Sequence, residues 1–132
     1  DVDMAGSCPF IPHKGTTLRD NPAGRDAMSL KALAVTRLIL KTVHLPATTA
    51  LLTLDGEGAR KAFTVGANVI MLKLESYKYR RLYEIYPKEF GEENNIKQER
   101  LKIEQFIESM GKEVAKNRGD SLKGKERLWQ NE

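Results

Sequence analysis

Apolar residues along the chain alternate between short continuous runs and stretches in which they recur every three or four positions. Three short runs predict strands, at residues 2–6, 47–51 and 68–72. Three periodic stretches predict helices, at residues 26–43, 56–65 and 78–86. This alternating order predicts an α/β fold with parallel strands and right-handed crossovers.

Local signals mark where these helices begin and end. Asp26 or Ser29 is suited to cap the first helix, whose apolar stripe consists of Leu30, Leu33, Ala34 and Leu38. Asp55 is suited to cap the second helix, and Gly66 stands where a helix commonly ends in a left-handed residue. The sequence therefore predicts two short, well-bounded helices between the strands.

The pattern changes outside this alternating region. A long loop rich in proline and glycine follows the first strand, and ordered loops of this length are often functional. Past Pro87 a polar break precedes a long predicted helix over residues 96–117, with apolar positions at Ile96, Ile103, Ile107, Met110 and Val114. We therefore divide the chain into residues 1–90 and a helical extension with a tail, residues 91–132.

Composition excludes several classes of protein. The 132 residues suffice for one modest domain, and no apolar run is long enough to cross a membrane. The net charge is only +4, and the basic residues are interleaved with acidic ones, so we expect no nucleic-acid partner. Cys8 alone cannot form an internal disulfide or a metal site built from cysteines, and it fits a cytoplasmic protein. Because the chain starts at Asp1 without a signal peptide or an initiator methionine, we expect a piece of a longer protein or a processed product.

Three βα units leave exposed parallel edges, so we expect them to be the last three units of a (β/α)₈ TIM-type barrel, followed by the long helix. In such barrels the functional side chains follow the carboxyl ends of strands, which nominates Met4, Thr48, Thr49 and Met71. Each also has a plain structural interpretation: threonines favour strands, only one of two neighbouring strand residues faces a given side, and methionines fill cores. His13 is better explained as a hydrogen-bonding loop residue than as a metal ligand, and Tyr83 as a packing residue. On these residues alone the reaction stays open.

Ordered motifs carry a resemblance that goes further. They are Asp1-Val2-Asp3-Met4, Pro9-Phe10-Ile11-Pro12-His13, Leu45-Pro46-Ala47-Thr48-Thr49-Ala50, Gly66-Ala67-Asn68-Val69-Ile70-Met71 and Leu82-Tyr83-Glu84-Ile85-Tyr86-Pro87. Together they resemble the C-terminal part of radical S-adenosylmethionine (SAM) enzymes of the biotin synthase-like family, which includes the [FeFe]-hydrogenase maturases and methylornithine synthase. The resemblance covers residues 1–87, and residues 108–112 resemble the tail of that family more loosely.

The resemblance implies that the chain supplies the sixth to eighth βα units of the barrel. Met4 and Ile11 would lie beside the adenosine end of SAM, and the cavity would be lined by Thr48, Thr49, Met71 and Tyr83. The missing N-terminal half would carry the three-cysteine loop that ligates a [4Fe–4S] cluster, so this chain supplies neither a metal ligand nor a catalytic residue. The implied chemistry is radical attack on a small, cysteine-derived sulfur substrate.

Departures from the family pattern leave the substrate open. Lys14-Gly15-Thr16 stands where the family has Pro-Asp-Thr, Leu72-Lys73 where it has Pro-Asn, and Lys88 where it has glycine. A biotin synthase-like or methylornithine synthase-like reaction is one alternative, and a truncated, non-catalytic binding partner is another. The expected partners are the missing barrel half, other hydrogenase maturases and, because an edge is open, a second copy of the chain.

Overall fold

The computed structural model describes residues 2–72, 75–80, 82, 83, 85, 86 and 95–122. The elements in chain order are α1 (Asp26–Ile39), β1 (Pro46–Ala47), α2 (Thr49–Leu54), α3 (Gly58–Thr64), β2 (Val69–Ile70), α4 (Tyr77–Arg80) and α5 (Ile96–Glu108). The predicted boundary between residues 90 and 91 lies outside the described residues, as do Lys73 and Lys88. None of the described helices is long and apolar enough to cross a lipid bilayer.

Three short segments run parallel to one another. β1 pairs with β2 in the register Pro46 with Val69 and Ala47 with Ile70. Met4 forms an isolated parallel bridge with His44, closed by the bonds from Ala5 N to His44 O (3.0 Å) and from His44 N to Asp3 O (2.9 Å). The segment around β1 is thus central, with the Met4 segment and β2 as its neighbours. The complete barrel remains a prediction.

The predicted strand at 47–51 is wrong beyond Ala47, because helix α2 begins at Thr49. The Thr48 carbonyl accepts the backbone N–H groups of Leu51 and Leu52, at 3.1 and 3.3 Å. Ala50 and Leu51 are both buried, whereas successive residues of a strand would point to opposite faces. Tertiary burial of this pair therefore overrides the local preference of the two threonines for a strand.

Helix α1 is shorter than predicted and has a different inner face. Its N-cap is Arg25, without a side-chain capping bond, so neither Asp26 nor Ser29 caps it. Leu33 is buried as expected, but Leu38 is 75% exposed. Arg37 takes the inner position near the end of the helix, and its Nη1 donates to the carbonyls of Leu40, Lys41 and Val43 at 3.1, 3.0 and 2.7 Å. These bonds satisfy carbonyl groups of the C-cap residue and of the segment beyond it, and they hold that segment against the end of the helix.

Helix α3 ends as the sequence predicted, with Gly66 just past the C-cap residue Val65 and at φ = 121°. The Ala67 N–H donates to the Ala62 carbonyl at 2.9 Å, as in a Schellman motif. A Cβ on Gly66 would lie 2.7 Å from the Arg37 side chain, so both backbone conformation and space require glycine here. At the other end, the N-cap residue is Glu57 rather than the predicted Asp55. Asp55 instead lies two residues earlier, and its Oδ1 accepts the Glu57 N–H at 3.0 Å.

Two later helices are also shorter than predicted. α4 spans only Tyr77–Arg80, where a helix was expected at 78–86. α5 begins after Asn95, whose Oδ1 accepts the Lys97 N–H at 3.0 Å, and ends at Glu108 rather than at residue 117. Gly111, at φ = 67°, turns the chain out of the helical conformation, and Val114 is consequently an exposed residue outside the helix.

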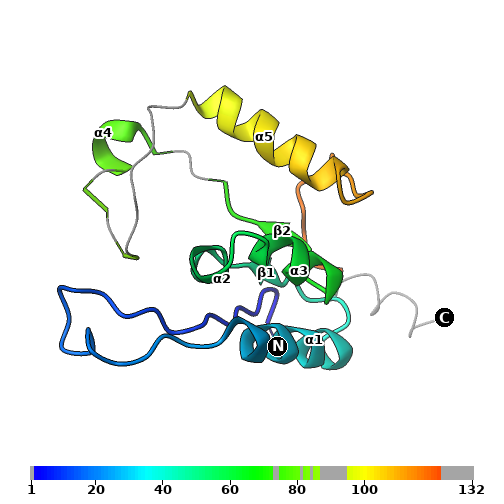
Figure 1. Cartoon of the computed structure of the whole chain (residues 1–132). Coiled ribbons are helices and arrows are strands. Elements are labelled where there is room, and N and C mark those ends of the chain that lie inside the picture. Colours follow the sequence, from blue (N-terminus) through cyan, green and yellow to red (C-terminus); the bar gives the residue numbers. More distant parts are fainter. Residues whose placement is uncertain (1, 73–74, 81, 84, 87–94, 123–132) are drawn as a thin grey trace.

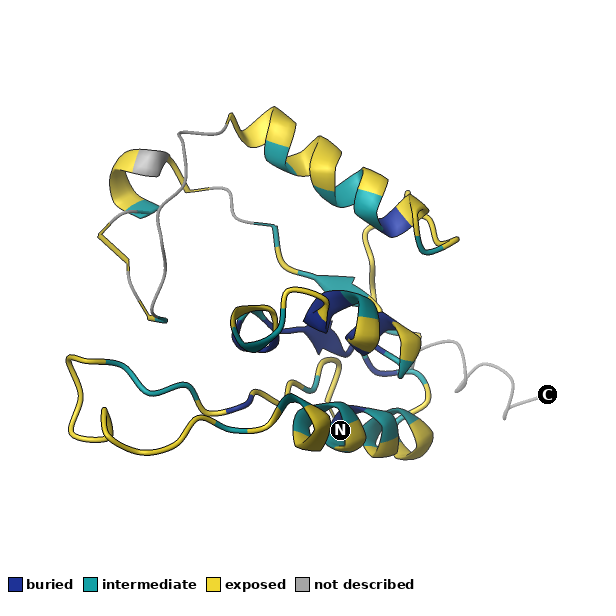
Figure 2. Cartoon of the chain, in the orientation of Figure 1, coloured by how far each residue is buried: buried dark blue, intermediate teal, exposed yellow. Residues whose placement is uncertain are grey.

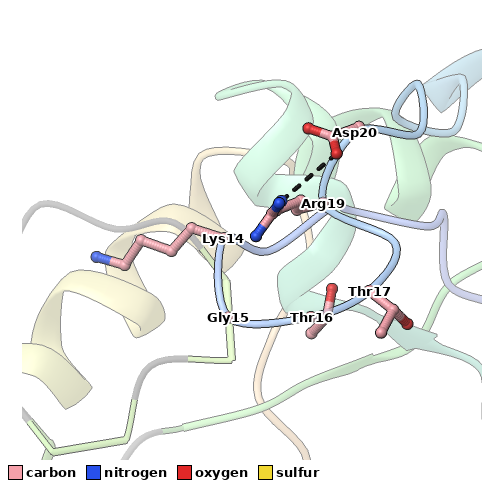
Figure 3. Close-up of a pocket in the computed structure, with 6 residues that line it drawn as sticks. All are labelled: Lys14, Gly15, Thr16, Thr17, Arg19 and Asp20. Carbon is pink, nitrogen blue, oxygen red and sulfur yellow. Dashed lines mark hydrogen bonds and ion pairs between the residues drawn. The ribbon is translucent and has the colours of Figure 1, made fainter.

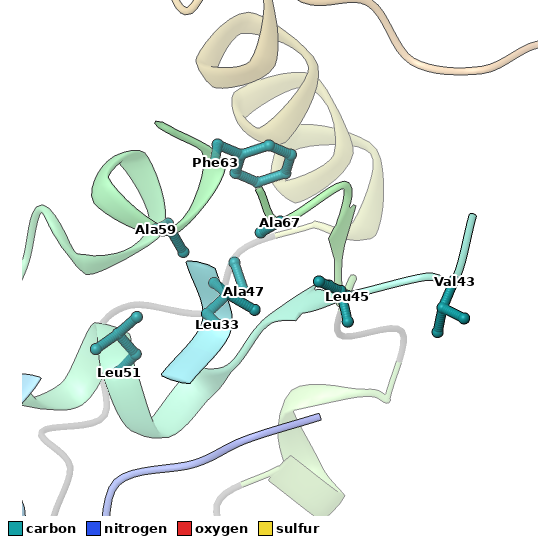
Figure 4. Packing of buried hydrophobic residues seen from close by; sticks show 9 residues of the cluster. Leu33, Val43, Leu45, Ala47, Leu51, Ala59, Phe63 and Ala67 are labelled. Atoms are coloured by element: carbon teal, nitrogen blue, oxygen red, sulfur yellow. The ribbon is translucent and has the colours of Figure 1, made fainter. Parts of the chain in front are cut away.

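A cluster of small and aliphatic side chains forms the core between α1, β1, α2 and α3 (Figure 4). Its members are Leu33, Val43, Leu45, Ala47, Leu51, Ala59, Ala62, Phe63 and Ala67. The end of α5 covers this cluster through Phe106 and Met110, and Ile107 is buried. The Arg60 guanidinium lies 5.3 Å from the centre of the Phe106 ring and donates to Ser109 Oγ at 3.1 Å, which joins α5 to α3.

A hydrogen-bond network joins the segments at the amino-terminal ends of the two strands. Asn68 Oδ1 accepts from Leu45 N at 2.8 Å and from Arg37 Nη2 at 3.1 Å. Both partners are donors, so Asn68 Nδ2 faces His44 Nδ1, at 3.2 Å, and donates to it. In neutral His44 the proton is therefore on Nε2, which donates to the Gly119 carbonyl at 2.8 Å. One network thus connects α1, both strands and the C-terminal segment.

Candidate functional site

The candidate site is the edge of the sheet where the parallel strands reach their carboxyl ends. Because Ala47 pairs with Ile70, the next residues along the two strands, Thr48 and Met71, occupy neighbouring positions at this edge. Met4 pairs with His44, four positions before Thr48, and so lies nearer the amino-terminal ends. The register therefore brings Thr48 and Met71 together and leaves Met4 apart from them.

Thr48 carries a buried polar group at this edge. The residue is 8% exposed, and its Oγ1 has no hydrogen-bond partner among the described residues. Thr48 is the N-cap residue of α2, yet its hydroxyl makes no capping bond. A buried hydroxyl without a partner costs about 1–3 kcal/mol, so this group is the best candidate on the edge for hydrogen bonding to a ligand or to another part of a larger protein.

The second threonine has a different environment from the one expected. Thr49 is half-buried as the first residue of α2, and its carbonyl accepts the Thr53 hydroxyl at 2.9 Å. The expectation that the two threonines face opposite sides of a strand does not apply, because the chain leaves the strand conformation between them. Thr48 and Thr49 both remain at the carboxyl end of β1, as residues of the strand-to-helix turn.

The other predicted site residues are more open to solvent. Met71 is 64% and Tyr83 69% exposed, whereas Ile11 is half-buried in the loop after the first strand segment. Burial raises the pKa of Tyr86, and the charges of Cys8 and Tyr83 raise it further.

That loop contains a hollow that the sequence did not single out (Figure 3). A cavity of about 590 Å³ is lined by Lys14, Gly15, Thr16, Thr17, Arg19 and Asp20. His13 shapes the turn beneath it: its Nδ1 accepts the Gly15 N–H at 3.1 Å, and its carbonyl accepts from the Thr16 N–H and hydroxyl at 3.0 and 2.9 Å. The interpretation of His13 as a hydrogen-bonding loop residue is confirmed. The hollow also contains Lys14-Gly15-Thr16, where the sequence departs from the family pattern, and this departure is the signal that could have located it.

The chain does not carry a ligand set for an iron–sulfur cluster. Its one cysteine, Cys8, is exposed. Within the described ranges, no group of three or more histidine, cysteine, aspartate or glutamate side chains is placed to hold a metal ion. A cluster bound by three cysteines would therefore need its ligands from another polypeptide segment.

Comparison with known proteins gives one informative similarity. The chain is 42% identical over 87 residues to the [FeFe] hydrogenase maturase subunit HydE of Thermotoga maritima. The match covers 66% of this chain and 25% of HydE, so the chain spans about a quarter of the length of this curated relative. The similarity supports the kinship with HydE-like radical SAM proteins that the motifs indicated. No protein-family model matches the chain.

Proposed function

We propose that the chain forms the last three βα units of the barrel of a HydE-like radical SAM enzyme and lines the substrate side of its cavity. The observation that carries the proposal is the 42% identity to HydE over 87 residues. The parallel pairing of the Met4 segment, β1 and β2 supports it, because consecutive barrel strands pair in this order. Since the chain carries one cysteine, its activity requires the remaining part of the barrel.

The residues of the chain take separate roles in this proposal. Met4 and Ile11 contact the adenosine end of SAM, and Thr48, Thr49, Met71 and Tyr83 line the cavity. When bound, SAM and the [4Fe–4S] cluster together supply a 5′-deoxyadenosyl radical. The buried Thr48 hydroxyl fits the substrate side, because it is a donor without a partner among the described residues. It would orient a small, cysteine-derived sulfur compound by donating a hydrogen bond to an anionic oxygen of that compound.

Reconstitution with a heterologous partner tests this proposal. The chain is co-expressed with the part of Thermotoga maritima HydE outside the matched quarter. The complex is loaded with iron and sulfide without oxygen, and SAM is added together with dithionite, which supplies the electron for its reductive cleavage. We expect SAM-dependent formation of 5′-deoxyadenosine by the complex and none by the chain alone. A complex that forms but makes no 5′-deoxyadenosine would contradict the catalytic role.

A threonine series in the same complex tests the substrate side. Replacing Thr48 with valine removes a hydrogen bond to a charged acceptor, which is worth about 1.5–3 kcal/mol. We therefore expect the affinity for the substrate to fall at least tenfold and the affinity for SAM to stay nearly unchanged. Thr49→Val tests the neighbouring residue in the same way. Thr53→Val is the matched control, because Thr53 is an exposed threonine of α2 that bonds only within its helix in the structure. Equal loss of SAM and substrate binding would indicate a damaged fold, and no loss would remove the threonines from the site.

A non-catalytic role is the second candidate, and the absence of a cysteine ligand set from the sequence favours it. In that case the chain serves only as a binding partner. The DNA immediately upstream distinguishes the two candidates: an adjoining reading frame with a Cys-x₃-Cys-x₂-Cys motif supports the enzyme, and its absence supports the binding partner. A biotin synthase-like or methylornithine synthase-like substrate is distinguished by product analysis of the reconstituted complex.

A further inference from the structure

Residues 111–122 form a segment that leaves the end of α5 and returns to the sheet, and we call it the C-terminal strap. The chain turns out of the helical conformation at Gly111, and every residue from 111 to 120 is exposed (Figure 2). The strap reaches the sheet at Gly119, whose carbonyl lies 2.8 Å from His44 Nε2. A segment with so little burial depends on its hydrogen bonds for a fixed position.

Local bonds within the strap present the Gly119 carbonyl to the sheet. Asn117 Oδ1 accepts the Gly119 N–H at 2.9 Å, and Arg118 Nη2 lies 2.8 Å from Asp120 Oδ1. Gly119 stands at φ = 76°, a left-handed conformation that glycine adopts without strain. The turn is therefore formed by the strap itself, and the bond from His44 attaches it to the sheet.

The imidazole of His44 lies between the strap and Asn68. Its Nδ1 faces Asn68 Nδ2 at 3.2 Å. The orientation of the Asn68 amide is fixed, because its Oδ1 already accepts from Leu45 N and Arg37 Nη2. In this arrangement Nδ1 accepts a hydrogen bond and Nε2 donates one, which only neutral imidazole with its proton on Nε2 can do.

A second proton on His44 conflicts with this arrangement. Imidazolium carries an N–H on both nitrogens, so Nδ1–H would point at the Asn68 NH₂ group, which is itself a donor. Turning the Asn68 amide over would set its NH₂ group against two other donors, Leu45 N–H and the Arg37 guanidinium. That change replaces one conflict with two, so the amide stays as it is and the imidazole has to move.

The ring of His44 can move while its backbone stays in place. The His44 N–H donates to the Asp3 carbonyl at 2.9 Å, and the His44 carbonyl accepts the Ala5 N–H at 3.0 Å. A rotation of the ring that takes Nδ1–H away from Asn68 also takes Nε2 away from the Gly119 carbonyl. Protonation of the ring and attachment of the strap therefore exclude each other.

The charged groups around the imidazole are of both signs. Arg37 at the end of α1 and the exposed Lys41 in the following turn are positive, and the exposed Asp3 in the Met4 segment is negative. In the strap, Asp120 is paired with Arg118, and the start of β2 contributes only an uncharged amide. The deciding interaction is thus the conflict between two donors rather than the local net charge.

We propose that His44 is a proton-operated latch, which attaches the C-terminal strap to the sheet when it is neutral and releases the strap when it is protonated. Histidine is the side chain whose charge ordinarily changes between about pH 5 and pH 8, and the half-buried ring of His44 is open to solvent. The latch lies at the amino-terminal ends of the strands, opposite the candidate site, so it does not depend on the proposed function.

Limited digestion of the full chain with trypsin tests the latch. Cleavage after Arg118 requires the strap to leave the sheet, so its rate follows the released fraction. Each rate is divided by that of a free peptide of residues 111–122, which corrects for the dependence of trypsin itself on pH. For the parent chain we expect this ratio to be about fivefold higher at about pH 5.5 than at about pH 7.5, the effect of losing one hydrogen bond.

Three variants separate the latch from a general effect of acid. His44→Phe keeps a ring but has no nitrogen, so the strap should be released at both pH values. Asn68→Asp replaces the donor that faces Nδ1 with an acceptor, so protonated His44 keeps its place and the rise in acid should disappear. His13→Gln is the matched control, because His13 is the other histidine of the chain and lies in a different loop, so the rise should persist.

Circular dichroism of every variant at both pH values accompanies the digestion. A rise in the parent and in His13→Gln alone, with unchanged dichroism, supports the latch. A parent ratio that does not depend on pH overturns the proposal, as does a rise that persists in Asn68→Asp or disappears in His13→Gln. A His44→Phe chain whose strap stays as protected as in the neutral parent also overturns it. Loss of helix by the parent in acid does the same, because unfolding rather than the latch then frees the strap.

Discussion

At the scale of single residues, Thr48 combines a structural cost with a candidate function. Its hydroxyl is buried without a hydrogen-bond partner among the described residues, although the residue stands at the N-cap of α2. Such groups destabilise the state in which they lack a partner. A residue that lowers the stability of the isolated chain and gains a partner in a complex is typical of a binding site.

We predict that Thr48→Val stabilises the isolated chain. Valine has a similar shape and removes the hydroxyl that lacks a partner, so the free energy of unfolding should rise by about 1 kcal/mol. Urea denaturation measures the change, with Thr53→Val as the control. A clear loss of stability would mean that the hydroxyl has a partner in solution, and Thr48 would then no longer be the best candidate at this edge.

Asp55 and Lys61 form an ion pair whose effect depends on pH. The hydrogen bond from Lys61 Nζ lowers the pKa of Asp55, as does the backbone N–H of Glu57, and Asp55 in turn raises the pKa of Lys61. A lowered carboxyl pKa contributes stability above the unfolded value and loses it as the pH falls through the folded value. A raised lysine pKa contributes stability below the unfolded value and loses it as the pH rises through the folded value.

We predict that Asp55→Asn lowers the melting temperature at neutral pH, because asparagine removes the charge but can still accept the Glu57 N–H. The difference from the parent chain should shrink as the pH falls through the lowered pKa of Asp55, where the parent also loses the charge. It should shrink again at alkaline pH as Lys61 is deprotonated. Thermal melts followed by circular dichroism across this range provide the check, and a difference independent of pH would contradict the electrostatic explanation.

At the scale of the elements, Arg37 holds the end of α1 to the start of β2. Its guanidinium donates to carbonyls of Leu40, Lys41, Val43 and Gly66 and to the side chain of Asn68. Asn68 in turn holds Leu45 and His44, at the beginning of β1. Arg37 and Asn68 therefore link the end of α1 to the beginnings of both strands.

We predict that Arg37→Met destabilises the chain by about 2–4 kcal/mol, because methionine keeps much of the apolar contact but leaves several carbonyl groups without a donor. Lys31→Met on the outer side of the same helix is the matched control and should change stability by less than about 0.5 kcal/mol. Urea denaturation of both variants measures the difference. Equal effects of the two substitutions would show that Arg37 does not hold these elements together.

At the scale of the whole molecule, the described residues include exposed apolar side chains and a short sheet with open edges. Met4 and Met71 are exposed beside the short sheet, and α1 exposes Met28, Val35, Leu38 and Ile39. An unprotected parallel edge is a template for pairing with another chain. The molecule is therefore expected to associate, either with the rest of the barrel that we propose or, without it, with copies of itself.

We predict that the isolated chain self-associates at micromolar concentrations through its open edge. Met4→Lys introduces a charge at the edge segment, which opposes edge-to-edge pairing, and should shift the chain toward the monomer. Leu101→Lys on α5 is the control and should leave the association unchanged. Sedimentation velocity provides the measurement, and a sharply monomeric parent chain would contradict the prediction.

The sequence by itself determined the features that depend on local sterics and spacing. Gly66 was predicted to end α3, because glycine readily adopts the left-handed conformation in which many helices end, and the structure confirms this at φ = 121°. The periodic apolar residues located α1, α3 and α5, although the ends of α1 and α5 differ. The motifs also carried the resemblance that the HydE match supports.

Only the tertiary structure decided the features that depend on distant partners. Thr49–Leu54 is a helix, since Ala50 and Leu51 are both buried in the core, and no local pattern contains that information. Arg37 replaced Leu38 on the inner face of α1 because its acceptors, Gly66 and Asn68, come from a segment 29 and 31 residues away. The burial of the Thr48 hydroxyl likewise follows from how β1 and α2 pack. Spacing predicts which residues share a face of one element, but the three-dimensional fold decides what that face meets.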